Sequence, residues 1–339
     1  CAVIAMTLWA ATDISTAPTK GWQVFSVFIA VIVSFTLRPF SMRTMVLLGL
    51  VVLTAMQTIT LTQALGGYGE TTVWLVLAAF IIAGGVVHTG FGRRLALVLV
   101  KVLGRSTLGL GYSLCASELL LGPAVPSNTA RGGGLLAPIM DSLARTLGST
   151  PDGQPERAGL FLTLVAAHAN LITSSMFLTG MAANPLVSKA AKDVLNIDFD
   201  WSTWALGAIV PGLIGLLLLP LLIYKLSPPT LTDARPAQQK AKEELGQMGP
   251  MKWREWVMVG TLILLLAFWS TKFLHGIGTT LVAWVGVSVL LVTRTVSWKE
   301  VLRNSKAWDT FVWLGGLLTM ANLLRDYDFI AWFAGSIQE

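Results

Sequence analysis

A run of small polar residues and glycines, Pro126–Gly134, lies between two apolar stretches of this chain, Leu108–Val125 and Leu135–Met140. A helix broken at the proline would expose backbone N–H groups. Those donors suit an anion such as a carboxylate, as do a guanidinium and small polar side chains. At membrane depth such groups are costly unless they line a cavity or contact a ligand. We therefore interpret the run as a binding site formed by Ser127, Asn128, Thr129 and Arg131. A polar kink packed against a neighbouring helix is the alternative.

The composition is that of a membrane protein, since 54% of the 339 residues are hydrophobic and 12% are charged, against about 25% charged in soluble domains. Thirteen Trp and several long apolar runs predict an all-α polytopic membrane protein. The net charge of +6 does not indicate nucleic acid, because the basic residues lie in short loops. Two cysteines, three scattered histidines and no P-loop predict no metal site, no cofactor and no direct ATP coupling.

Apolar runs mark the expected helices. These are Gly21–Leu37, Met45–Thr62, Thr72–Val87, Ala158–Leu178, Trp204–Tyr224, Trp256–Thr271, Ile277–Val292 and Thr310–Leu324, with Ala2–Ala11 as the tail of a first helix. Neither arm of Leu108–Met140 has the about 20 apolar residues of a full span, so we interpret this region as a re-entrant helical hairpin. Polar segments are expected at Gly66–Glu70, Ser142–Arg157, Lys189–Asp200 and Arg294–Asp309, the last of them amphipathic.

Lys and Arg fall mainly in alternate loops. With the hairpin contributing no crossing, 18 of the 24 lie on one side, five lie on the other, and Arg131 is the last. The positive-inside rule then makes the first side cytoplasmic. A single crossing by Leu108–Met140 would largely remove this asymmetry, so the distribution favours the hairpin.

A short internal repeat relates Thr71–Leu75 to Thr310–Leu314, 239 residues later. Five crossings separate the copies, so the second is inverted, as in secondary transporters whose site lies where broken helices meet. Chance similarity of apolar segments is the alternative. The counterpart of Ser127 would lie beyond Glu339, so we expect the second repeat to be truncated in this chain.

The domain organisation follows. We expect scaffold helices leading into a first repeat (1–106) and a first-repeat transport region (107–185) with the re-entrant hairpin 108–140 and a broken helix 158–185. The last helix of that repeat (186–224), a cytoplasmic linker (225–254) and the start of the second, inverted repeat (255–339) complete the chain.

The motif Pro126–Arg131, the segment Gly92–Leu97 and the break Thr179–Asn184 together resemble the divalent anion/sodium symporter family. The similarity covers nearly the whole chain and is strongest to the branch of the bacterial citrate/succinate antiporter and the 2-oxoglutarate/malate translocator. The resemblance implies a multi-pass homodimer in the bacterial inner membrane that carries di- and tricarboxylates by an elevator-like movement. It also implies that Gly180 and Asn184 form a wall of the substrate site beside Ser127, Asn128 and Thr129.

Arg131 replaces a small uncharged residue of the sodium-coupled members. We expect its charge to stand in for sodium and to favour exchange, because an empty site with an unbalanced charge crosses the membrane poorly. Glu118 is the obvious counter-charge, and a buried structural ion pair of the two residues is an equal alternative. His168, beside Asn170, is expected to be a packing histidine rather than a ligand.

The leading prediction is therefore a secondary antiporter of dicarboxylates or citrate. The alternative is a sodium-coupled symporter of the same family, with sodium near Ser127, Asn128 and Gly180. A membrane enzyme is disfavoured because no nucleophile with a base or paired carboxylates are seen. A non-transporting subunit would not need two broken helices.

Overall fold

The computed structural model describes residues 6, 7, 9, 18–125 and 127–338. The expected helical tail Ala2–Ala11 and the proline of the motif, Pro126, fall largely or wholly outside them. The described chain is helical apart from one isolated bridge between Ser106 and Asp233. Five of its helices are long and apolar enough to cross a membrane, which agrees with the all-α polytopic prediction: Thr19–Leu37, Thr71–Thr89, Gly159–Met176, Trp201–Leu226 and Trp253–Ser270.

The chain divides into two compact units, which we describe separately. The first comprises the described residues of 1–77 and 304–339. Its elements in order are α2 (Thr19–Leu37), α3 (Met42–Ala55), α4 (Leu61–Leu65), the 3-10 helix η1 (Gly66–Gly69), the start of α5 (Thr71–Thr89), α17 (Ser305–Asp326) and α18 (Phe329–Gln338).

Aliphatic side chains from α2, α3 and α17 form the core of this first unit, among them Val27, Leu50 and Met320. η1 packs closely on α17: the backbone N–H of Gly67 donates to Thr319 Oγ1 at 2.9 Å, and a side chain at Gly67 would collide with the helix. Two predictions were wrong here. The expected helix Met45–Thr62 ends at Ala55, and the expected polar turn Gly66–Glu70 is mostly this 3-10 helix.

The second unit, residues 78–303, contains Ser127, Asn128, Thr129 and Arg131 of the polar motif. After α5 its elements are α6 (Phe91–Leu103), α7 (Thr107–Leu121), the π-helix η2 (Thr129–Leu136), α8 (Ala137–Thr146), the 3-10 helix η3 (Pro155–Arg157), α9 (Gly159–Met176), α10 (Ala183–Leu195), α11 (Trp201–Leu226), α12 (Arg235–Met248), α13 (Trp253–Ser270), α14 (Lys272–His275), α15 (Thr279–Val292) and α16 (Trp298–Arg303).

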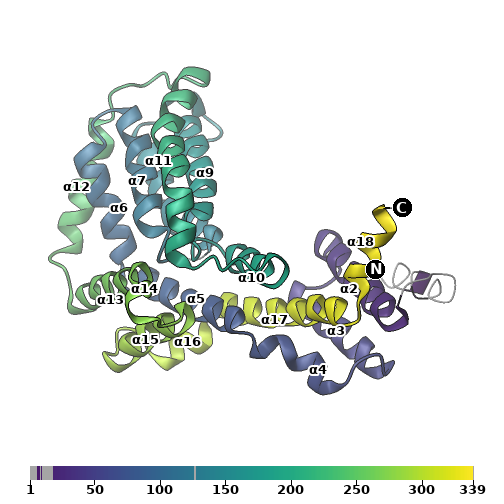
Figure 1. Ribbon diagram of the computed structural model, residues 1–339. Helices are drawn as coiled ribbons and strands as arrows, with labels where there is room; N and C mark the ends of the chain where they lie inside the picture. The colour runs from purple at the N-terminus through teal and green to yellow at the C-terminus, as the bar shows by residue number, and fades with distance from the viewer. Residues whose placement is uncertain (1–5, 8, 10–17, 126, 339) are drawn as a thin grey trace. The chain divides into compact units, whose positions relative to one another are not determined.

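Helices α6, α7, α9, α11 and α12 lie side by side (Figure 1). Capping residues set several of their ends: Ser106 Oγ accepts the N–H of Gly109 at the start of α7, and Asp200 Oδ1 accepts that of Thr203 at the start of α11. Between α5 and α6 the chain turns at Gly90, whose φ of 80° suits glycine. The break between α5 and α6 therefore comes from one left-handed residue.

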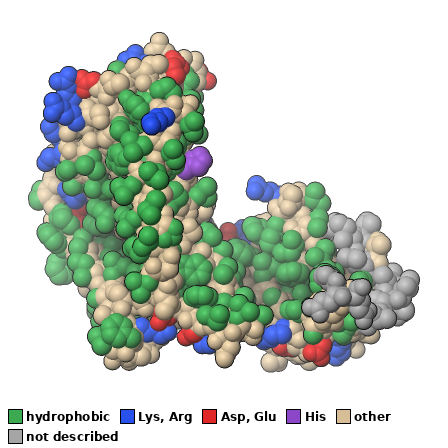
Figure 2. All heavy atoms as spheres, turned by 45° about the horizontal axis from the view of Figure 1, so that its top comes forward, with side chains coloured by type: hydrophobic (Ala, Val, Ile, Leu, Met, Phe, Trp, Pro, Cys, Tyr) green, Lys and Arg blue, Asp and Glu red, His purple; other side chains and the backbone are tan. Residues whose placement is uncertain are grey.

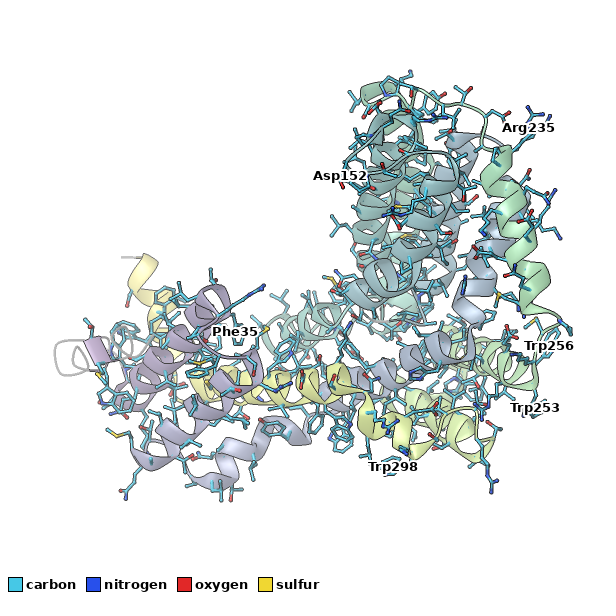
Figure 3. The ribbon with its side chains drawn as sticks, turned by 180° about the vertical axis from the view of Figure 1, so that it is seen from behind. Phe35, Asp152, Arg235, Trp253, Trp256 and Trp298 are labelled. Atoms are coloured by element: carbon cyan, nitrogen blue, oxygen red, sulfur yellow. The ribbon has the colours of Figure 1, made fainter. Side chains whose placement is uncertain are left out.

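The outer face of α11 is apolar over most of its length. Figure 2 shows hydrophobic side chains spread over the visible face of this unit, and the exposed residues of α11 include Leu206, Val210, Leu217 and Leu222. Trp253, Trp256 and Trp298, at the starts of α13 and α16, are also exposed (Figure 3). Apolar surface of this extent is what a lipid-facing helix presents.

The segment Thr230–Ala234 is bonded to the start of α7 and to η3, which follows α8 after a loop. At the start of α7, Thr107 N donates to Thr232 O at 3.0 Å, and Thr107 Oγ1 bonds to the same segment. Beyond α8, the backbone of Thr230 donates to Glu156 O at 3.0 Å. Figure 3 shows Asp152 and Arg235 near the same end of the unit. The residues that precede α7 and those of η3 are thus held by the same segment, and the re-entrant hairpin stays a prediction.

In three further segments that were expected to be polar loops or a linker, part of the polar stretch is helical. α8 extends five residues into the loop expected at Ser142–Arg157. α10 includes Lys189 to Leu195 of the loop expected to reach Asp200. α12 occupies the middle of the linker 225–254 and buries Ala237 and Ala241. The charged residues expected in loops lie on the polar faces of these amphipathic helices.

Candidate functional site

The chain between α7 and η2 is held by its own polar groups. Ser127 Oγ accepts the N–H of Ala130 at 3.2 Å, and Asn128 Oδ1 accepts the N–H of Thr129 at 2.9 Å. The predicted break exists, but the next helix begins at once, so fewer backbone donors are free than the sequence suggested. Within the described residues, the hydroxyls of Ser127 and Thr129 and Nδ2 of Asn128 make no donor hydrogen bond. Three side-chain donors therefore remain at the hairpin tip.

The outward face of η2 is smooth. Thr129, Gly133 and Gly134 are exposed, and a Cβ built at either glycine would meet nothing within 4 Å. Gly132 differs, because its Cβ would come within 3.0 Å of the Asn170 amide. Packing against Asn170 thus favours glycine at position 132, while Gly133 and Gly134 leave backbone exposed to open space. π-Helical turns of this kind recur at functional sites.

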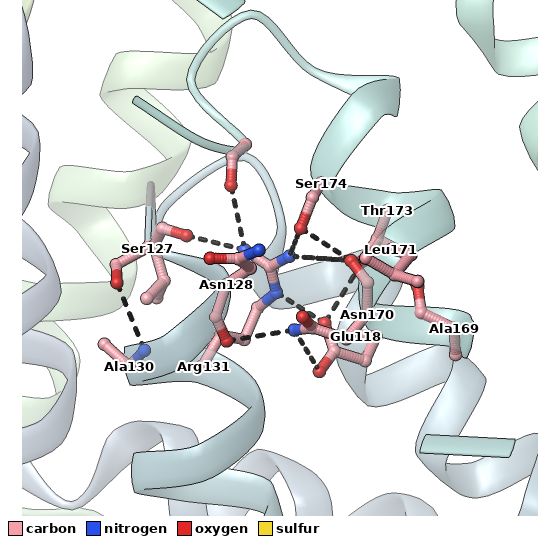
Figure 4. Close-up of polar contacts among 12 residues, drawn as sticks. Glu118, Ser127, Asn128, Ala130, Arg131, Ala169, Asn170, Leu171, Thr173 and Ser174 are labelled. Atoms are coloured by element: carbon pink, nitrogen blue, oxygen red, sulfur yellow. Dashed lines mark hydrogen bonds and ion pairs between the residues drawn. The ribbon is translucent and has the colours of Figure 1, made fainter. Parts of the chain in front are cut away.

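Arg131 and Glu118 form a completely buried ion pair, with Arg131 Nε 2.5 Å from Glu118 Oε2 (Figure 4). The carboxylate is held on both oxygens. Asn170 Nδ2 donates to Oε1 at 3.0 Å, and Thr173 Oγ1 donates to Oε2 at 3.1 Å. Asn170 also donates to the carbonyl of Asn128 at 3.2 Å, so the pair is connected to the hairpin tip. A buried ion pair is tolerated when its remaining hydrogen-bonding groups are satisfied in this way.

The other guanidinium nitrogens reach both breaks. Nη1 donates to Val125 O at 2.6 Å and to Gly180 O at 3.2 Å. Nη2 donates to Ser174 Oγ at 2.8 Å and to Thr173 Oγ1 at 3.3 Å. Because a guanidinium has five N–H groups, no donor is left for a ligand. The geometry favours the structural ion pair over Arg131 as a ligand to substrate.

The second break is also held by hydrogen bonds among its own residues and the end of α9. Asn184 Nδ2 donates to Ser174 O at 2.7 Å and to Phe177 O at 2.8 Å. The N–H of Gly180 donates to Phe177 O at 2.7 Å. Gly180 lies close to the first break, because its carbonyl accepts from Arg131, whereas the amide of Asn184 bonds within the second break. They shape the site without offering an N–H group to an anion.

Sequence reasoning missed Thr173 and Ser174, which bond to Arg131 from α9. Together with Asn170 they have the spacing i, i+3, i+4 that places polar side chains on one helix face. That pattern, three polar residues on one face of an apolar helix, was the available signal. His168 lies on another face; it is exposed and its Nδ1 is 2.8 Å from Leu164 O. In the described part of the chain, no cluster of three His, Cys, Asp or Glu residues suits a metal ion.

Comparison with known proteins places this architecture. The model of the sodium:sulfate symporter transmembrane region matches residues 1–339. The chain belongs to the sodium:sulfate symporter family. This membership confirms the resemblance drawn from the motifs and the prediction of a transporter rather than a membrane enzyme.

Individual members of the family are similar over almost the whole chain. The putative malate transporter YflS of Bacillus subtilis is 40% identical over 99% of this chain and 70% of its own length. The chloroplast dicarboxylate transporter 1 of Arabidopsis thaliana is 41% identical over 94% of this chain and 57% of its own length. The inner membrane protein YbhI of Escherichia coli is 37% identical over 93% and 67%. The chain thus spans between 57% and 70% of these relatives.

Proposed function

We propose that the full-length protein exchanges di- and tricarboxylates of the succinate, malate, 2-oxoglutarate or citrate type across the bacterial inner membrane. The donors at the hairpin tip, on Ser127, Asn128 and Thr129, bind one substrate carboxylate. Arg131, Gly180 and Asn184 form the wall behind it. The names of two relatives, a malate and a dicarboxylate transporter, support this substrate class.

The observation that carries the proposal is the position of the Arg131 guanidinium. Its Nη1 donates hydrogen bonds to Val125 O and Gly180 O, one carbonyl from each break. Unwound carbonyls at half-helix ends are where transporters of inverted-repeat architecture coordinate sodium. A permanently charged side chain at these two oxygens takes the place of a mobile cation. We infer that sodium is not required.

The reason for exchange differs from the one expected on sequence. Glu118 balances Arg131, so the empty site has no net charge from this pair. The electrical cost lies in the substrate instead. A dianion entering without a cation works against an inside-negative potential by about 2.3 kcal/mol per charge for every 100 mV. Returning with a second dianion cancels that cost, so an uncoupled carrier of dianions is driven towards exchange.

We further propose that the hairpin tip and the second break travel together, as the elevator-like movement of a homodimer requires. Arg131 bonds to both, and Asn170 ties the tip to α9. Bonds of this kind favour displacement as one body over separate movement of each break.

Uptake of labelled malate, succinate, 2-oxoglutarate and citrate by the full-length protein in liposomes tests the proposal. We expect uptake only into liposomes loaded with unlabelled dicarboxylate, and at the same rate in sodium and in potassium buffer. The matched control is Arg131→Ala with Glu118→Ala, which removes the internal cation and its counter-charge together. Robust uptake into empty liposomes driven by a sodium gradient would instead establish the symporter alternative.

A further inference from the structure

The two breaks are joined a second time, at a place away from Arg131. Thr179 Oγ1 donates to Pro123 O at 2.7 Å, from the second break to the first. A side chain at Gly122 would lie 3.2 Å from the ring of Phe177, so these segments are also in close contact. Thr179 is 2% exposed. This link contains no charge and is shielded from water.

Trp201, the first residue of α11, supports this link. Its indole Nε1 donates to Thr179 Oγ1 at 3.1 Å. Because a hydroxyl has one hydrogen, accepting the indole N–H leaves that hydrogen for Pro123 O. The indole is stacked between Phe177, with ring centroids 5.9 Å apart, and Trp269, at 5.8 Å. Stacking on two faces fixes the direction of the N–H bond.

We propose that Trp201 is a positioning residue for the carboxylate site, acting through the Thr179 hydroxyl to hold the second break in register with the hairpin tip. The inference rests on the proposed function, since it assigns the breaks to substrate binding. Losing the indole N–H frees the hydroxyl to rotate. Losing the hydroxyl leaves Pro123 O and the indole N–H buried without partners, which costs more than removing one neutral hydrogen bond.

Transport kinetics of the full-length protein in dicarboxylate-loaded liposomes test the assignment. Trp201→Phe keeps an aromatic ring between Phe177 and Trp269 and deletes the N–H. We expect the KM to rise three- to tenfold with an unchanged maximal rate. Thr179→Val should raise KM at least as much, and Thr179→Ser should restore it. The matched control is Trp204→Phe. Trp204 is another tryptophan of α11 whose indole N–H donates a hydrogen bond, but its acceptor is Ser175 O in α9, at 2.9 Å, and not the Thr179 hydroxyl.

The double variant decides whether the two residues act as one unit. Trp201→Phe with Thr179→Val should have the KM of Thr179→Val alone, because both remove the same hydroxyl link. Independent, multiplying effects would overturn the proposal, as would an unchanged KM in Trp201→Phe.

A measurement without substrate separates this inference from the proposed function. In a variant lacking Cys1 and Cys115, a cysteine at Ser127 is alkylated with a maleimide. We expect Trp201→Phe to alter the alkylation rate at least threefold, and Trp204→Phe to leave it unchanged. If the rate changes while no carboxylate is transported, the positioning link stands and the substrate assignment fails. If neither rate nor KM changes, Trp201 has no positioning role.

Discussion

Nε of Arg131 lies 2.5 Å from Oε2 of Glu118, and neither side chain is exposed. Removing one member of such a pair destabilises the folded protein far more than removing both, because a single removal leaves a buried charge unpaired.

We therefore expect Glu118→Gln to destabilise the protein by about 3–5 kcal/mol, seen as a large fall in Tm or in the yield of folded protein in detergent. The double variant Glu118→Gln with Arg131→Gln should be more stable than Glu118→Gln alone. Asp141→Asn is the control, since its pair with Arg145 is exposed and such pairs contribute less than about 1 kcal/mol. A Tm of Glu118→Gln equal to that of the wild type would contradict the assignment.

Asn128→Ala should sharply reduce transport at near-normal expression. Its Nδ2 is one of the donors left at the tip, and a hydrogen bond to a charged group contributes about 1.5–3 kcal/mol, equivalent to roughly a tenfold to hundredfold change. Concentration-dependent uptake of labelled malate measures it. Asn184→Ala serves as the comparison: both of its donors are used internally, so it should lower Tm as well as uptake. Unchanged kinetics in Asn128→Ala would remove this amide from the site.

Gly133→Ala should retain or raise stability while slowing transport. A Cβ at this position meets nothing in the described chain, and alanine favours a helix over glycine by about 1 kcal/mol. If substrate or another segment of the full-length protein approaches this backbone, the methyl group will obstruct it. Tm and uptake are measured together. Gly132→Ala is the contrasting variant, because its methyl would press on Asn170. Normal uptake by Gly133→Ala would leave this face without a role.

Cysteines at Ser106 and Arg145 should be labelled from the same side of the membrane. Thr107 and Glu156, which flank the predicted hairpin in the sequence, both bond to the segment Thr230–Ala234, and the Lys and Arg distribution predicts that this side is cytoplasmic. Labelling in right-side-out and inside-out vesicles with an impermeant maleimide, in a variant lacking the native cysteines, distinguishes the possibilities. Labelling from opposite faces would exclude the hairpin.

Acid should weaken the cap of α11. Burial raises the pKa of Asp200, but hydrogen bonds from Thr203 and Ser202 and the charge of Lys272 outweigh it and hold that pKa below its ordinary value. The ionised carboxylate therefore stabilises the folded state above pH of about 4, and this contribution is lost as the pH falls through the folded pKa. Asp200→Ala should lower Tm at pH 7 and approach the wild type at low pH.

Cap substitutions of this kind cost about 1 kcal/mol. Asp152→Ala, on an exposed loop, is the control and should leave Tm unchanged at both pH values. A constant difference between Asp200→Ala and the wild type down to pH 3 would show that the cap does not depend on the charge.

The membrane class, the family and both breaks were predictable because apolar runs and the Pro-Ser-Asn-Thr motif are local features of the sequence. The choice between the two roles of Arg131, ligand to substrate or buried ion pair with Glu118, was not predictable. A guanidinium beside a serine and an asparagine looks like an anion ligand until Glu118, Thr173 and Ser174 are seen to use its donors. Those partners come from α7 and α9, and their meeting depends on tertiary packing that residue spacing on a single helix does not determine.

The polar stretch around α12 shows the same limit in another way. It was expected to be a linker, since it combines Pro228–Pro229 with a run of charges. Its helical middle depends on burying Ala237 and Ala241 against neighbouring helices. Two small apolar residues among charges are too weak a periodic signal to predict that packing.

The contacts on either side of α12 determine what happens to this protein after proteolytic cleavage. A protease that cuts the exposed side of α12 would divide the polypeptide between residues 235 and 248 of 339. Within the upstream product, Thr230–Ala234 would stay bonded to Arg105, Thr107, Glu156 and Arg157. Across the cut, α6 would remain joined to α13 by the ion pair of Arg94 and Glu255. A nicked molecule would therefore give two bands on a denaturing gel and migrate as one particle on a sizing column. Because the two products stay together, α12 is also a place where the gene can be split and the two parts co-expressed.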